Sequence, residues 1–225
     1  MQITLFYGSR TIVQKPFPGG GNPRNDYGSG FYCTESIELA REWASSDNGD
    51  GFVNEYTIDT EGLSTLNLSD KPFHILNWLA VLLENRTFDL KAPLPAQAKK
   101  YILDNFLPDY KHSDIIAGYR ADDSYFSFSR AFLDNSISLT QLSRAMKLGK
   151  LGEQIVLKSE LAFDRIQFRQ AFPVSSSEYY PRKMARDRLA REQYFNMLKE
   201  SHDNSALYAI DMIRQNWKND DTRLF

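Results

Sequence analysis

Glu153 and Gln154 stand directly before an apolar run, residues 155–157, that has the composition of a β-strand. A carboxylate or a side-chain amide at the start of a strand can hold a sugar hydroxyl while a glycosidic bond stretches, and a carboxylate also stabilises the positive charge that develops. Neighbouring side chains of a strand face opposite sides, so only one of the two can act in one site. Either Glu153 or Gln154 could therefore supply this group. A solvated charge at a strand end is the other interpretation of Glu153.

Two aromatic residues near the N-terminus could form a slot for a flat ligand. Tyr32 follows a glycine-rich segment, and Trp43 falls on the inward face of a helix for which Thr34 is the predicted cap. Aromatic faces attract a flat cationic ring, and they lose that attraction when the ring becomes neutral. Packing in the core is the alternative role for both rings.

Three segments, in their order along the chain, resemble the NAD-binding motifs of ADP-ribosyltransferases; they are residues 5–10, 27–34 and 153–156. The first is similar to the His-Gly-Ser motif of poly(ADP-ribose) polymerases, with Tyr7 at the place of the histidine. In that family the glycine backbone binds the nicotinamide amide, which implies this role for Gly8, where no side chain is wanted. Ser9 would add a hydroxyl to the same site. Tyr7 can donate a hydrogen bond to a ribose hydroxyl, and we count it among the catalytic residues.

The other two motifs imply the remaining contacts with NAD. Tyr32 stands where that family has a tyrosine flat against the nicotinamide ring, and Trp43 corresponds to the second aromatic of the sandwich. We also count Thr34 among the cofactor-binding residues. Glu153 resembles the acidic residue of a Glu-x-Ile-Val strand start, and this makes it the first choice as the catalytic residue. A register one residue later places Gln154 in that role instead.

Over about residues 3–170 the chain resembles a little-characterised bacterial transferase-like family, whose members are suspected toxins of toxin–antitoxin or phage-defence loci. The resemblance implies NAD as co-substrate, an antitoxin partner and a macromolecular acceptor, which can be protein, RNA or DNA. An Ala-Asp-Asp stretch is shared with this family, so Arg120, Asp122 and Asp123 form a possible acceptor loop, although adjacent Asp residues are more often turn formers or helix caps. No metal is expected, because the three histidines lack ligand spacing.

A basic segment lies in the predicted C-terminal helix. It could contact RNA or an acidic antitoxin, and a solvated helix face is the alternative. Its five basic residues are Arg182, Lys183, Arg186, Arg188 and Arg191.

The amino-acid composition shows which classes of protein are compatible with this chain. The 225 residues are 42% hydrophobic and 25% charged, as in ordinary globular proteins, and the formal net charge of -2 argues against a globally electrostatic grip on nucleic acid. Cys33 is the single cysteine, and no apolar run reaches the length of a membrane span. We therefore expect a cytoplasmic protein without a membrane segment.

The expected fold class is α+β, and the resemblance implies an ADP-ribosyltransferase-like split β-sheet core. Residues 1–172 form the predicted transferase-like domain, with a helical insertion at about residues 73–107, and residues 173–225 form a helical C-terminal extension. Two helices are predicted in the insertion, at 75–85 and 96–106, and a third at 138–148, with Ser138 as its cap.

Four functions are compatible with these residues. The leading one is an ADP-ribosyltransferase that releases nicotinamide, acting as a bacterial toxin. The second is hydrolysis of NAD without a macromolecular acceptor. The third is a catalytically degenerate NAD-binding or interaction module, which the replacement of histidine by Tyr7 keeps open. The fourth is RNA binding by the basic helix.

Overall fold

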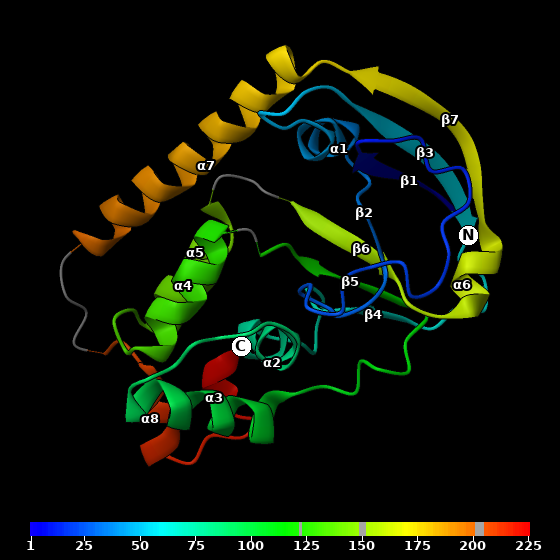
Figure 1. Ribbon diagram of the computed structural model, residues 1–225. Helices are drawn as coiled ribbons and strands as arrows, with labels where there is room; N and C mark the ends of the chain where they lie inside the picture. The colour runs from blue at the N-terminus through cyan, green and yellow to red at the C-terminus, as the bar shows by residue number, and fades with distance from the viewer. Residues whose placement is uncertain (122, 149–151, 201–204) are drawn as a thin grey trace.

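The computed structural model describes residues 1–121, 123–148, 152–200 and 205–225, and it contains two β-sheets and eight α-helices in these ranges (Figure 1). The predicted α+β class is confirmed. The first sheet is antiparallel and has the order β1 (Gln2–Ser9), β3 (Gly51–Asp59), β7 (Ile166–Val174). The second has the order β2 (Phe31–Cys33), β6 (Glu153–Leu157), β5 (Ile115–Tyr119), β4 (Thr65–Asn67).

The second sheet lies between the first sheet and a group of helices (Figure 1). Its strands are antiparallel except for the parallel pair β4 and β5. On one face, Ile115 and Leu157 pack with residues of the first sheet, and on the other face Ile116 and Val156 pack with the helices. Burial on both faces explains the continuous apolar runs at residues 115–118 of β5 and 155–157 of β6.

The three helices predicted in the middle of the chain are present, and further helices are present where the sequence pattern predicted none. Ser138 caps its helix as predicted, in a capping box with Gln141. The eight helices are α1 (Ile37–Ala44), α2 (Ile75–Asn85), α3 (Pro93–Phe106), α4 (Asp123–Leu133), α5 (Leu139–Ala145), α6 (Glu160–Arg165), α7 (Ser176–Leu198) and α8 (Ala209–Arg214).

Two local predictions are wrong. Thr34 does not cap α1, because Ser36 is the N-cap and accepts from the backbone N–H of Leu39 at 3.3 Å. The hydroxyl of Thr34 instead accepts from the N–H of Ser36. The segment after Arg120 is not simply a loop, because α4 begins at Asp123.

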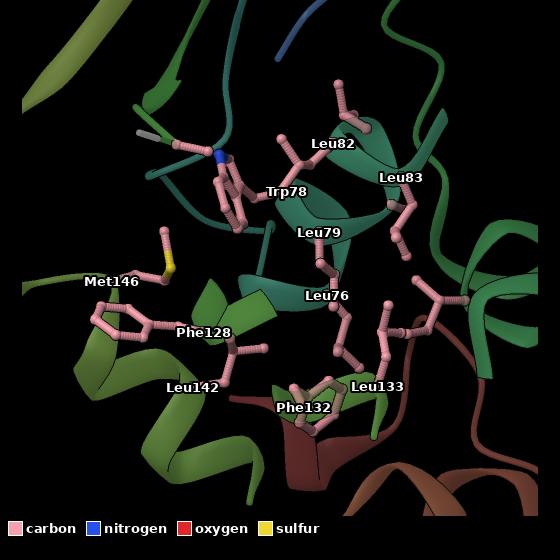
Figure 2. Packing of buried hydrophobic residues seen from close by; sticks show 14 of the residues in the cluster. Leu76, Trp78, Leu79, Leu82, Leu83, Phe128, Phe132, Leu133, Leu142 and Met146 are labelled. Carbon is pink, nitrogen blue, oxygen red and sulfur yellow. The ribbon is translucent and has the colours of Figure 1, made fainter. Parts of the chain in front are cut away.

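Helix α2 forms the centre of the largest core. Residues 76–83 are buried all around the helix, which is the pattern of a helix without a solvent face. Figure 2 shows Leu76 and Leu79 of α2 beside Phe132 and Leu133 of α4, with Leu142 of α5 nearby. The predicted helical insertion therefore belongs to the same core as the second sheet.

None of the helices in the described ranges combines the length and the apolar character that a bilayer crossing requires.

Helix α7 is tied to α1 by a largely buried ion pair. Arg186 donates from Nε and Nη2 to the two carboxylate oxygens of Glu42, each at 2.8 Å. The Glu42 side chain is only 7% exposed. Such a two-bond contact fixes both distance and orientation, so the C-terminal helix helps to position α1.

Replacing Arg186 by methionine is expected to lower the free energy of unfolding by about 3 kcal/mol, because Glu42 would be left buried without its cation. Urea unfolding followed by circular dichroism measures this change. Arg188 is exposed on the same helix, so Arg188→Met is the matched control and should stay near the wild-type value. Equal losses in both variants would contradict the structural role of the ion pair.

Candidate functional site

A cavity of about 230 Å³ lies where residues of all three predicted motifs meet. Its lining residues are Tyr7, Asn25, Asp26, Tyr32, Trp43, Arg86, Arg120, Ala121 and Gln154. Five of them, Tyr7, Tyr32, Trp43, Arg120 and Gln154, are predicted site residues. Strands β1, β2 and β6 and helix α1 therefore bring distant parts of the sequence into one candidate site.

Strand β6 separates the two candidates for the catalytic residue. Gln154 is 4% exposed and lines the cavity, whereas Glu153 is exposed and does not line it. Because side chains alternate along a strand, Gln154 shares its face with Val156, and Glu153 points to the opposite face. Of the two alternatives, the structure brings Gln154 into the site.

Asp26 is a site residue that the sequence prediction missed. Its carboxylate is 6% exposed, and its Oδ2 accepts from Nε2 of Gln154 and from the backbone N–H of Ala121, both at 2.9 Å. Nη1 of Arg86 lies 3.6 Å from Oδ1. The sequence feature that could have indicated Asp26 is its place directly before the second motif, which is aromatic and rich in glycine.

Burial raises the pKa of the Asp26 carboxyl above its ordinary value of 3.8. The two hydrogen bonds and the charges of Arg86 and Arg120 act in the opposite direction, and burial outweighs them. A buried carboxylate at a cavity wall is a frequent feature of functional sites.

Gly8 lies at the edge of β1 that faces β2. The N–H and C=O of Phe6 bond to Thr34 on this edge, and backbone polar groups alternate along a strand, so those of Gly8 point to the same edge. A Cβ on Gly8 would collide with the Ala40 carbonyl and come within 2.9 Å of the Trp43 Cβ. Glycine therefore lets α1 pack closely on β1, and it leaves this backbone beside the cavity residues Tyr7 and Trp43.

The hydroxyl of Ser9 is engaged within the fold. It accepts from Nδ2 of Asn54 at 2.9 Å and donates to the carbonyl of Thr11 at 2.6 Å. Asn54 is fully buried, and it also bonds to the carbonyl of Tyr7 and to the N–H of Val13. Ser9 is thus part of the support behind Tyr7, and it does not line the cavity.

The ring of Tyr32 is held by its hydroxyl, which donates to the carbonyl of Gly28 at 2.5 Å and accepts from the N–H of Tyr27 at 3.1 Å. Gly28 adopts a φ of 75°, a left-handed conformation that favours glycine. Burial raises the pKa of Tyr32, so its phenol stays protonated in the physiological range. The turn therefore fixes the ring in place at the cavity wall.

Trp43 presents its ring to Arg120. The guanidinium carbon of Arg120 lies 4.7 Å from the ring centroid, which is a cation–π contact. The indole Nε1 of Trp43 is buried and has no hydrogen-bond partner among the described residues. Arg120, predicted in an acceptor loop, is therefore part of the cavity wall itself.

Thr34 is a predicted site residue that does not line this cavity. Asp122 lies outside the described residues, and Asp123 is the first residue of α4. Thr34 is buried, and its backbone pairs with Phe6 of β1. In the part of the chain that the structure describes, no three His, Cys, Asp or Glu side chains gather as they would around a metal ion.

A second cavity of about 360 Å³ adjoins the first. The two share Tyr7, Asn25 and Tyr32 in their linings. The walls of the second cavity hold no charged side chain; they include Phe17 and Phe31. The first cavity is thus polar and charged, and the second is lined by uncharged residues that include two phenylalanines; the two tyrosines belong to both.

Ion pairs on α7 offset much of the charge of the predicted basic surface. Arg182, Arg186 and Arg191 pair with Glu178, Glu42 and Asp187, each at 2.8 or 2.9 Å. Lys183 is partly buried, and Arg188 is exposed. The helix therefore presents less net positive charge than the sequence indicates.

Residues 3–168 match the family described as "Protein of unknown function (DUF3990)", and the chain belongs to this family, since the match covers more than half of its 225 residues. No curated protein matches the chain. No solved structure matches it either. The matched range nearly coincides with that of the predicted bacterial family, and the likeness to ADP-ribosyltransferases stays a prediction.

The raised pKa of Asp26 predicts how stability depends on pH. The folded state binds this proton more tightly than the unfolded chain does, so the contribution of Asp26 to the free energy of unfolding falls as pH rises from about 4 through the raised pKa. Asp26→Asn removes this contribution. The unfolding free energy of wild type, relative to that of Asp26→Asn, should therefore decrease over this range.

Urea unfolding at a series of pH values measures this difference. Asp114 is the matched control, because hydrogen bonds from Ser159 and Ser64 lower the pKa of that carboxyl. The difference between wild type and Asp114→Asn should increase as pH rises through the lowered pKa toward 3.8. Slopes of the same sign for the two residues would refute the assignment of Asp26 as a buried carboxylate.

Proposed function

We propose that this protein is an NAD-dependent ADP-ribosyltransferase. The observation that carries the proposal is that one cavity gathers Tyr7, Tyr32, Trp43 and Gln154, which come from all three motifs resembling those of that superfamily. These residues are widely separated in the sequence, and an NAD site built from the three motifs requires that they lie close together. The chemistry of the walls supports NAD as the substrate, since they combine aromatic rings, side-chain amides and guanidinium groups beside one carboxylate.

The aromatic residues and Gly8 would bind the nicotinamide end of NAD. Tyr32, held by its turn, and Trp43 of α1 offer ring faces to the flat pyridinium. The backbone N–H and C=O of Gly8 face the edge of β1 next to these rings, and they would pair with the carboxamide. The attraction to aromatic faces weakens when nicotinamide leaves as a neutral molecule, so the slot favours release of the product.

Gln154 would hold the 2′-hydroxyl of the ribose during cleavage. Its side-chain oxygen accepts that hydrogen bond while the bond from C1′ to nicotinamide breaks and the electron pair leaves with the nicotinamide nitrogen. The positive charge left on the sugar is then attacked by a nucleophilic group of the acceptor, which loses its proton. Arg120 at the cavity wall supplies positive charge for the diphosphate of NAD.

Hydrolysis of NAD would use the same residues, with water as the nucleophile. The resemblance to suspected toxins also carries the proposals of a cytoplasmic toxin, an antitoxin partner, and an acceptor among protein, RNA and DNA. The exposed Arg188 and its neighbours on α7 are the proposed contact for an acidic antitoxin or RNA.

Gln154→Ala is expected to reduce nicotinamide release from NAD at least 100-fold, because the contact with the reacting sugar is lost. Glu153→Ala is the matched control: it removes an adjacent side chain that is exposed and outside the cavity, so its rate should remain within about twofold of wild type. Radiolabelled NAD and separation of free nicotinamide give both rates.

Bacterial lysate, RNA and DNA offered in the same reactions would identify the acceptor. Label that enters one of these pools supports transfer, and label that remains in free ADP-ribose supports hydrolysis. Absence of nicotinamide release from the wild type with every acceptor would overturn the enzymatic proposal. The reverse order of the two variants would return the catalytic role to Glu153.

A further inference from the structure

The carboxylate of Asp26 is the strongest polar partner of Gln154. It lies in the segment that leads into β2, far from β6 in the sequence, and the two side chains meet at 2.9 Å between Nε2 and Oδ2. Both are more than nine-tenths buried, with exposed fractions of 6% and 4%. A charged hydrogen bond at this depth is shielded from water and is strong.

This contact determines which end of the Gln154 amide faces the cavity. The NH₂ group donates to Asp26, and the carbonyl of Tyr119 lies 3.5 Å from the same nitrogen. Both neighbours are acceptors, so the opposite orientation of the amide would place oxygen against oxygen. The amide oxygen is therefore the part of Gln154 that remains for a hydroxyl of a bound ligand.

Asp26 is itself fixed from three sides. The backbone N–H of Ala121 donates to Oδ2 at 2.9 Å, and Arg86 at the end of α2 lies 3.6 Å from Oδ1. The carbonyl of Asp26 accepts from Asn85, the last residue of that helix, at 3.4 Å. The end of α2 and the segment after β5 thus hold the carboxylate that orients Gln154.

We propose that Asp26 is a positioning residue, whose carboxylate orients and polarises the amide of Gln154 so that its oxygen can hold the ribose hydroxyl. The inference rests on the proposed NAD cleavage and names a residue outside the three motifs. An anion that accepts from the NH₂ group increases the negative charge on the amide oxygen. A neutral glutamine then provides part of the stabilisation that a carboxylate at the same position would provide.

An exchange of the two groups tests this role. Asp26→Asn keeps the shape and an acceptor oxygen but removes the charge. Gln154→Glu places two carboxyl groups in contact, where they repel each other when both are ionised. The double variant Asp26→Asn/Gln154→Glu restores one carboxylate and one amide, with the direction of the hydrogen bond reversed.

In nicotinamide release, Asp26→Asn should lower kcat about 10- to 100-fold and change KM less than about threefold. Asp26 orients Gln154 and does not itself touch the substrate, so its loss affects the chemical step more than binding. Gln154→Glu should be impaired at neutral pH and should recover at lower pH, where the carboxyl pair shares a proton. The double variant should be at least tenfold more active than Gln154→Glu at neutral pH. Asp59→Asn, an exposed site distant in the first sheet, is the control and should match wild type.

Urea unfolding of the same variants separates failure of this inference from failure of the proposed function. A wild-type kcat in Asp26→Asn, or a double variant no better than Gln154→Glu, would overturn the positioning role even if wild type cleaves NAD. Absence of cleavage by wild type would overturn the proposed function and the positioning role of Asp26 together. In that case a higher urea midpoint of the double variant than of Gln154→Glu would still show the contact between the two side chains.

Discussion

Burial of the second sheet on both faces is the constraint that the candidate site depends on. Strand β6 has the first sheet on one side and the helices around α2 on the other, so its register cannot shift by one residue without placing Gln154 and Val156 on the wrong face. At the start of this strand the alternation therefore sends Gln154 inward and Glu153 to solvent. A buried amide needs partners, and Asp26 and the carbonyl of Tyr119 supply them.

Much of the architecture could be predicted from local patterns, because those patterns report on contacts within a few residues. The capping box of Ser138 and Gln141 and the apolar helix at 75–85 are of this kind. The assignment of Thr34 as a cap failed because a serine two residues later has the same capping chemistry, and only the backbone conformation selects between them. Helix α4 was missed because it begins at the second of two adjacent Asp residues, a pair that also occurs in turns.

The site residues that belong to the three motifs could be predicted from the sequence. An aspartate that is buried in the fold could not. Tyr32 and Trp43 were predicted because the three motifs, in their order along the chain, resemble those of ADP-ribosyltransferases. Asp26 was not, because an aspartate before a glycine-rich segment is most often a turn former. Its partners Ala121 and Gln154 are separated from it by long stretches of chain, so its place before the second motif does not by itself show that it is buried.

The C-terminal helix extends the site beyond the residues that match the family. The match ends at residue 168, yet Arg186 of α7 holds Glu42, which directly precedes Trp43 on α1. Because α1 also packs against Gly8, a displacement of α7 would be transmitted to both sides of the proposed nicotinamide slot. The extension is thus joined to α1 by charge pairing, and any partner that binds α7 would act on a helix that contacts the one carrying Trp43.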